Sequence, residues 1–315
     1  MKRKSIIISI KSFELSVAEE KLIKNNKPWG VILFKRNIAN IDQLKKLTTR
    51  IRFLMKDKFY PIMIDEEGGK VSRLSNIFNT KNFSQNYFGK QFEKNLNQGI
   101  KLYEEYLSFI SQFLSYSGIN MNTIPVLDVL KKNTHSIIGN RAYSSRPNTI
   151  NILKKTCFKI LRRYKIACVM KHIPGHGSSI VDTHKVVSVV NRPTKSLLND
   201  DFKVFKNFNS KFAMTAHIIY KSIDPFNTAT HSKNLIKNII RKKLMFKGIL
   251  ISDDISMKAL SGDIIYNAQK AIESGCNLVL YCKGDIKESS ALLAQIANID
   301  NFTTKKTSEF YRFLR

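Results

Sequence analysis

The sequence is poor in acidic residues, and this deficit sets its charge. It has 24 Asp and Glu against 53 Lys and Arg in 315 residues, which gives a formal net charge of +29. Such a surplus makes nucleic acid, anionic lipid and acidic substrates the partners to consider. The basic residues are scattered along the chain, however, and Lys, Asn and Ile recur throughout, as in KNLIKNII. We therefore attribute the surplus to compositional bias and expect no specific nucleic-acid partner.

Cysteine and long apolar runs are scarce as well. The four cysteines (Cys157, Cys168, Cys276 and Cys282) form no CxxC motif, so we expect reduced residues in a reducing compartment. No apolar run approaches the roughly 20 residues of a membrane span. The apolar run at residues 6–10 is shorter than the roughly 7–15 residues of an export signal. We interpret it as a first strand and expect a cytoplasmic monomer without a membrane span.

The chain also lacks a linker rich in Pro, Gly or Ser, and we interpret residues 1–315 as one domain. Short β-branched runs alternate with amphipathic segments. Strands are predicted at 5–10, 30–35, 60–65, 119–128, 166–172, 212–218, 248–254 and 277–282. Helices are predicted at 41–55, 93–116, 147–163, 195–208, 232–244 and 263–274. This count suits an α/β TIM barrel, (β/α)₈, possibly with one irregular strand, and a doubly wound open sheet is the rival.

The positions of the polar residues favour the barrel. The polar residues at the carboxyl ends of predicted strands are Asp65, Asp128, Lys171, His172, His217, Asp253 and Asp254. In a barrel these ends converge on one mouth, where active sites are built. In an open sheet they would be spread along an edge.

The densest motif is KHIPGHGSSIVDTH, residues 171–184. Pro174 and the glycines that follow make it a loop, so its histidines do not share a helix face as in a zinc HExxH motif, and we expect no metal. In extended backbone Asp182 and His184 project to the same side. The carboxylate then fixes the imidazole tautomer and leaves one nitrogen to exchange protons. On this spacing alone, a surface pair without function is the better explanation.

Two further segments carry candidate chemistry. In ILISDDISM only one of the adjacent carboxylates Asp253 and Asp254 faces the mouth easily, where it acts as nucleophile or charge stabiliser. The other, which we take to be Asp254, is predicted to cap a helix. Asp65 with Arg73 either clamps sugar hydroxyls or forms an internal ion pair, and Arg141 suits an acylamino or carboxylate group. We place Trp29, the single tryptophan, in the core.

Together these segments resemble the single-domain bacterial β-N-acetylhexosaminidases of glycoside hydrolase family 3. The resemblance covers nearly the whole chain. It is carried by WGVILFKRNI, MIDEEGGKVSRL, IPVLDV, IIGNRAYSS, KHIPGHGSSIVDTH, AMTAHIIY, FKGILISDDISMKAL and SGCNLVLYC, in that order. The resemblance implies a TIM barrel, a retaining mechanism and no cofactor.

By motif, the resemblance implies that Asp253 is the nucleophile, that His184 is the acid/base and that Asp182 orients it. The implied sugar-binding residues are Asp65, Arg73, Arg141, Lys171 and His172. The implied substrate is N-acetylglucosamine β-1,4-linked to 1,6-anhydro-N-acetylmuramic acid, a muropeptide handled in cytoplasmic peptidoglycan recycling.

The chain departs from the family at several places, none of them catalytic. Glu66 stands where Gln is common, Asn140 where Asp is common, Ser178 where an acidic residue is frequent and His231 where Leu is usual. Two alternative functions remain open: a β-glucosidase-type activity on the same barrel, and a basic nucleic-acid-binding protein.

Overall fold

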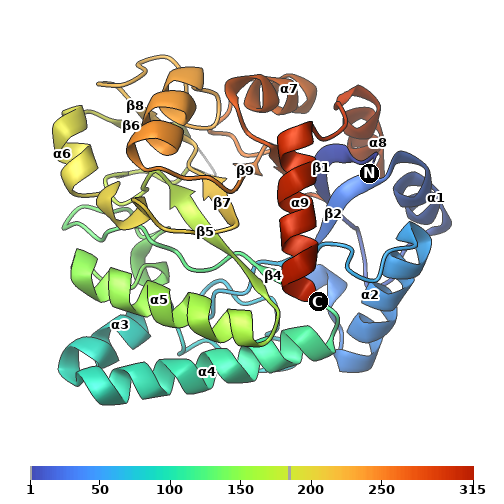
Figure 1. Cartoon of the computed structure of the whole chain (residues 1–315), viewed down its shortest axis with the longest axis horizontal. Coiled ribbons are helices and arrows are strands. Elements are labelled where there is room, and N and C mark those ends of the chain that lie inside the picture. Colours follow the sequence, from blue (N-terminus) through green and yellow to red (C-terminus); the bar gives the residue numbers. More distant parts are fainter. Residues whose placement is uncertain (1, 184–185) are drawn as a thin grey trace.

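A closed barrel of parallel strands forms the centre of the molecule (Figure 1). The structure is a computed structural model that describes residues 2–183 and 186–315. Within these residues, eight parallel strands pair around the barrel in the order β1-β10-β9-β7-β5-β4-β3-β2. They are β1 (Lys4–Ser9), β2 (Pro28–Leu33), β3 (Ile62–Ile64), β4 (Met121–Asn122), β5 (Ala167–Ile173), β7 (Phe212–Thr215), β9 (Ile249–Asp254) and β10 (Leu278–Tyr281). The predicted TIM barrel and its eight strands are confirmed.

The barrel interior is apolar, as expected for strands covered on both faces. Every residue of β2 and β5 is buried. The interior cluster includes Ile32, Met63, Val169 and Ile251. This packing makes the barrel a rigid support for the polar residues that follow each strand.

Helix α9 (Asn301–Leu314) closes the amino-terminal end of the barrel. Its Phe310 stacks on Trp29 at 6.3 Å between ring centroids and meets Phe212 edge-on at 5.2 Å. The Trp29 indole N–H donates to Thr307 Oγ1 at 2.9 Å. Trp29 has no exposed surface, which confirms its predicted place in the core.

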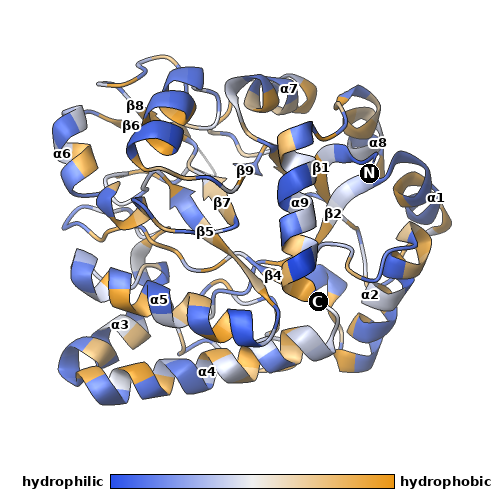
Figure 2. Cartoon of the chain, in the orientation of Figure 1, coloured by the Kyte–Doolittle hydropathy of each residue, from blue (hydrophilic) through white to orange (hydrophobic). Residues whose placement is uncertain are grey.

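The remaining helices surround the barrel (Figure 1). They are α1 (Val17–Asn26), α2 (Ile41–Met55), α3 (Gln85–Lys94), α4 (Leu96–Tyr116), α5 (Pro147–Arg163), α6 (Thr194–Asn199), α7 (Ile264–Ser274) and α8 (Ile286–Gln295). Figure 2 shows polar and apolar residues along α4 and α5, as expected for helices that bury one face. The predictions for α2 and α5 match the structure to the residue.

Three predicted helices differ from the structure. Residues 93–116 belong to two helices, because Asn95 ends α3 and caps α4. Residues 195–208 break after α6 into a 3₁₀ turn, Lys203–Phe205. The segment Leu235–Lys243 is a π-helix. A small parallel sheet of β6 (Ser188–Val190) and β8 (Ile218–Tyr220) was not predicted.

No helix in the described ranges is both long enough and apolar enough to cross a membrane.

Candidate active site

A pocket of about 550 Å³, its mouth included, opens at the carboxyl ends of the barrel strands. The predicted residues Asp65, Arg141, Lys171, His172 and Asp253 line it. The pocket therefore occupies the end of the barrel where TIM-barrel enzymes place their chemistry.

Asp65 follows β3 directly and collects three donors. Its carboxylate accepts from Lys171 Nζ at 2.6 Å and from Arg73 Nη2 at 2.5 Å, and it also accepts from the Thr123 hydroxyl. Burial raises the pKa of Asp65, but the adjacent Lys171 and Arg73 cations outweigh it and hold the pKa well below its usual range. Asp65 and Arg73 thus form the internal ion pair, and the Asp65 carboxylate also faces the pocket. The ion pair is therefore compatible with the predicted binding of sugar hydroxyls.

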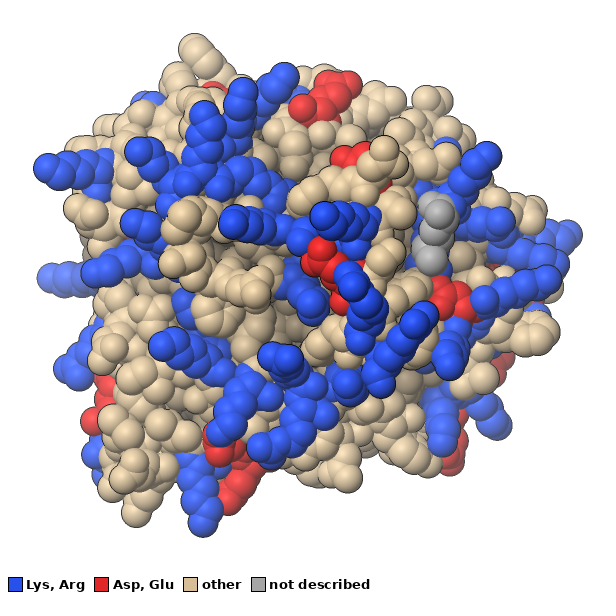
Figure 3. Space-filling model, in the orientation of Figure 1, with Lys and Arg blue, Asp and Glu red and all other residues tan. Residues whose placement is uncertain are grey.

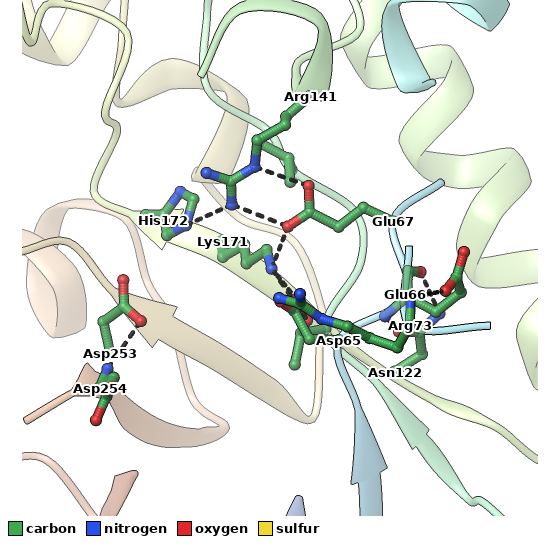
Figure 4. Close-up of polar contacts among 12 residues, drawn as sticks. Asp65, Glu66, Glu67, Arg73, Asn122, Arg141, Lys171, His172, Asp253 and Asp254 are labelled. Atoms are coloured by element: carbon green, nitrogen blue, oxygen red, sulfur yellow. Dashed lines mark hydrogen bonds and ion pairs between the residues drawn. The ribbon is translucent and has the colours of Figure 1, made fainter. Parts of the chain in front are cut away.

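Glu67 connects the two cations on the other side of the site. It accepts from Arg141 Nε at 2.8 Å and Nη2 at 2.9 Å, a bidentate pair, and from Lys171 Nζ at 2.5 Å. Lys171 is buried, and its contacts with Asp65 and Glu67 outweigh that burial and raise its pKa. Lys171 and Arg141 are therefore fixed, charged donors at the pocket wall (Figure 4).

His172 is oriented by a buried carboxylate. Its Nδ1 lies 2.7 Å from Asp128 Oδ2, and Asp128 Oδ1 accepts from the backbone N–H of His176 at 2.7 Å. The pKa of Asp128 is lowered, because His172 and His176 outweigh its burial. The ionised carboxylate assigns the proton to Nδ1 of His172 and leaves Nε2 toward Arg141 Nη2, 3.4 Å away.

Asp253 lies at the end of β9, across the site from the Asp65, Glu67, Arg141 and Lys171 network (Figure 4). Its Oδ1 accepts from the Asp254 backbone N–H at 2.8 Å. Burial would raise the pKa of Asp253, but His217, His172 and Lys171 outweigh it and lower the pKa. Asp253 is therefore an ionised carboxylate beside the pocket at neutral pH.

Asp254 does not cap a helix, and that prediction is wrong. Its carboxylate accepts from the Ser256 backbone N–H at 3.1 Å, the Ser256 hydroxyl at 2.8 Å and the Cys282 backbone N–H at 3.2 Å. The chain after it forms turns that bury Ile255, and helix α7 begins only later with Asp263 as its cap. Asp254 thus fixes the β9 end that carries Asp253.

The loop after β5 is anchored at its base. Ser178 Oγ donates to Asp201 Oδ2 at 2.6 Å, and Arg192 Nη1 donates to the same oxygen at 2.7 Å. Further along, Thr183 lines the pocket, with Oγ1 3.3 Å from His176 Nε2. Burial lowers the pKa of His176 to about 4.

The predicted dyad is only partly described. Asp182 precedes Thr183 in this loop and is partly buried. His184 lies outside the described residues. Among the residues that are described, no group of three or more His, Cys, Asp or Glu side chains is arranged to hold a metal ion.

The structure brings together five predicted residues in the pocket and adds four that the sequence reasoning did not assign to the site. Those four are Glu67, Thr123, His176 and Asp128. Asp128 was singled out as a strand-end residue, but without a role. Glu67 stands in the EEGG motif next to Asp65, and that adjacency was its only signal. The arrangement offers an ionised carboxylate opposite fixed donors, which suits attack on or stabilisation of a developing cation.

Comparisons with known proteins agree with this geometry. Residues 5–309 match the profile described as "Glycosyl hydrolase family 3 N terminal domain". A beta-hexosaminidase of Hydrogenovibrio crunogenus is 32% identical over 292 residues, covering 91% of this chain and 81% of that protein. A beta-hexosaminidase of Chromobacterium violaceum is 32% identical over 300 residues, covering 94% of this chain and 83% of that protein.

The fold has a similar solved counterpart. The crystal structure of NagZ from Neisseria gonorrhoeae in complex with N-trifluoroacetyl-D-glucosamine has a TM-score of 0.89 and 28% identity to this chain. The match covers 100% of this chain and 90% of that protein.

Proposed function

The chain belongs to glycosyl hydrolase family 3 and is a β-N-acetylhexosaminidase, and we propose that it acts on cell-wall muropeptides. The proposed reaction releases N-acetylglucosamine from its β-1,4 linkage to 1,6-anhydro-N-acetylmuramic acid, with peptidoglycan recycling in the cytoplasm as its setting. The observation that carries the proposal is the ionised Asp253 facing a pocket lined with fixed donors. The net charge of +29 also favours substrates that carry carboxylates.

Asp253 is the proposed nucleophile of a retaining mechanism. One of its oxygens attacks the anomeric carbon and forms a glycosyl ester, while the bond to the leaving oxygen breaks. His184, oriented by Asp182, is the proposed acid that gives its proton to that oxygen. In the second step His184 takes a proton from water, the water oxygen bonds to the anomeric carbon and Asp253 leaves as a carboxylate.

The remaining pocket residues are proposed to bind the sugar. Asp65 carries acceptor oxygens for hydroxyl groups, and its three donors hold it in one orientation. Arg141 and Lys171 are held by Glu67 and place their positive charges at the pocket wall. These contacts fix the ring while the anomeric carbon approaches Asp253.

Mass spectrometry of products from purified anhydro-muropeptides tests the substrate. We expect free N-acetylglucosamine together with the matching anhydro-N-acetylmuramoyl peptide. Hydrolysis of an aryl N-acetylglucosaminide without cleavage of muropeptides would leave the hexosaminidase assignment and reject the substrate. Faster hydrolysis of an aryl glucoside than of the aryl N-acetylglucosaminide would instead favour the β-glucosidase alternative.

A further inference from the structure

Basic side chains that are scattered in the sequence gather at the amino-terminal end of the barrel. A hollow between α5, the start of β7 and the end of α9 is lined by Lys159, Arg162, Lys165, Lys211 and Arg312. They come from three separate segments of the chain. The only acidic residue in this lining is Glu309, which pairs with Lys306 at 2.8 Å.

A second hollow continues along the same helix. It is lined by Arg241, Lys247, Lys305 and Lys306, near the starts of β9 and β10. Its one acidic residue, Asp300, already accepts from the Thr303 backbone N–H as the cap of α9. We name the two hollows together the α9 basic track.

The lining of the α9 basic track is strongly cationic. The two linings hold nine Lys and Arg against two acidic residues, whereas the whole chain has 53 against 24. Figure 3 views this end of the molecule and shows Lys and Arg side chains beside α9 with few acidic side chains among them. In the described part of the chain, Lys159 and Lys306 are the members of the track that form ion pairs. Burial lowers the pKa of Lys211. The nearby Glu309 opposes this, and Lys306, Arg162 and Arg312 add to it.

Aromatic side chains are interleaved with these cations. Phe158, Phe208 and Phe313 line the first hollow and are partly exposed. Phe302 lines the second hollow and is 40% exposed, with Arg241 and Lys306 of the track lying 5.7 and 6.0 Å from its ring centroid. Cations that bind a phosphate backbone next to aromatic faces that stack on bases are the combination used for single strands. An acidic peptide would use the charges but not the aromatic faces.

We propose that the α9 basic track binds single-stranded nucleic acid without sequence preference. The sequence predicts no specific nucleic-acid partner, and binding without sequence preference is compatible with that prediction. The 14 residues of α9 span about 21 Å, a length covered by about six nucleotides at duplex rise. Because the track and the pocket lie at opposite ends of the barrel strands, both sites are accessible at once.

A pair of charge-matched variants tests the proposal. The track variant combines Arg162→Gln, Lys211→Gln and Arg312→Gln. The control variant removes the same charge elsewhere, through Lys21→Gln, Lys24→Gln and Lys101→Gln on exposed positions of α1 and α4. Binding of a labelled single-stranded 12-mer is measured by fluorescence anisotropy over a range of salt concentrations.

We expect the track variant to bind at least tenfold more weakly at low salt. We also expect the slope of log K against log salt to fall by about 2, since each lost phosphate contact removes about 0.7. The control variant should change Kd less than threefold. Equal losses in the two variants would overturn the proposal, because net charge alone would then explain the binding.

A second measurement separates nucleic acid from other polyanions. Phe302→Leu should weaken binding about fivefold or more without changing the salt slope. Two results together would reject nucleic acid in favour of an acidic polymer. Polyglutamate of matched charge would compete as well as the 12-mer, and Phe302→Leu would have no effect on binding. Unchanged Tm values would show that the variants fold. Because the assay measures binding and not hydrolysis, its outcome is independent of the proposed muropeptide reaction.

Discussion

Replacing Glu66 by Gln is expected to stabilise the protein at neutral and alkaline pH. Glu66 is only 1% exposed. Its Oε2 accepts from the backbone N–H groups of Arg73 at 2.5 Å and Leu74 at 3.0 Å and from the Ser72 hydroxyl at 3.3 Å. Burial raises its pKa from 4.5 to about 7, despite these hydrogen bonds. A Gln side chain keeps an acceptor oxygen for the same donors and carries no charge.

The sign of the effect follows from proton linkage. Below pH 4.5 the carboxyl is protonated in both the folded and the unfolded chain, and its raised pKa costs nothing. Between pH 4.5 and about 7 the unfolded chain releases the proton while the folded chain keeps it, so the free energy of unfolding falls as pH rises. Above that range the cost is constant at about 3 kcal/mol. Glu66→Gln removes this cost, less about 1 kcal/mol for weaker hydrogen bonds.

Urea denaturation at pH 5 and pH 8, followed by circular dichroism, measures the effect. We expect a gain of about 2 kcal/mol at pH 8 and no measurable gain at pH 5, where the raised pKa costs only about 1 kcal/mol. The neighbouring Glu67→Gln is the matched comparison, because it leaves two buried cations without their carboxylate and should destabilise by about 3–5 kcal/mol. The reasoning would be refuted if Glu66→Gln did not raise the free energy of unfolding at pH 8, or if the increase were no larger at pH 8 than at pH 5.

Three further predictions concern the reaction and the core. Asp253→Ala should reduce hydrolysis of every substrate by at least 10³-fold in steady-state assays, whereas Asp254→Asn, which alters only the support of the strand end, should retain measurable turnover. His184→Ala should slow muropeptide hydrolysis far more than hydrolysis of an activated aryl glycoside, and equal losses on the two would show that His184 is not the acid. Trp29→Ala should cost about 3–5 kcal/mol in urea denaturation through the cavity left beneath Phe310, and a cost below 1 kcal/mol would mean that α9 contributes little to closing the barrel.

The strands were predictable because parallel barrel strands are buried on both faces and appear as short apolar runs. Helices were harder to predict. Residues 93–116 keep one apolar periodicity, yet Asn95 can end one helix and cap the next. The periodicity of 195–208 likewise does not reveal that the chain turns after Asn199 to bury Phe202 and Phe205.

The candidate site was predictable where polar residues follow strands directly, as with Asp65, Lys171 and Asp253. Glu67 was missed because its function depends on contacts with Arg141, 74 positions away. Asp254 was given the wrong role because capping propensity is local, whereas its contact with Cys282 comes from the residue that follows the neighbouring strand β10. Residue type and spacing therefore predicted which end of the barrel carries the site, but not the contacts that hold the site residues in place.

The pairing of β1 with β10 also constrains how the chain matures during synthesis. Ile6 of β1 pairs with Val279 of β10, so 273 further residues must be synthesised before β1 can pair with β10. At roughly 5–20 residues per second, that interval lasts about 15–50 s. Throughout it, the edge of the IIIS run is available to other nascent chains. The ring of strands is therefore sealed only after β10 has emerged from the ribosome.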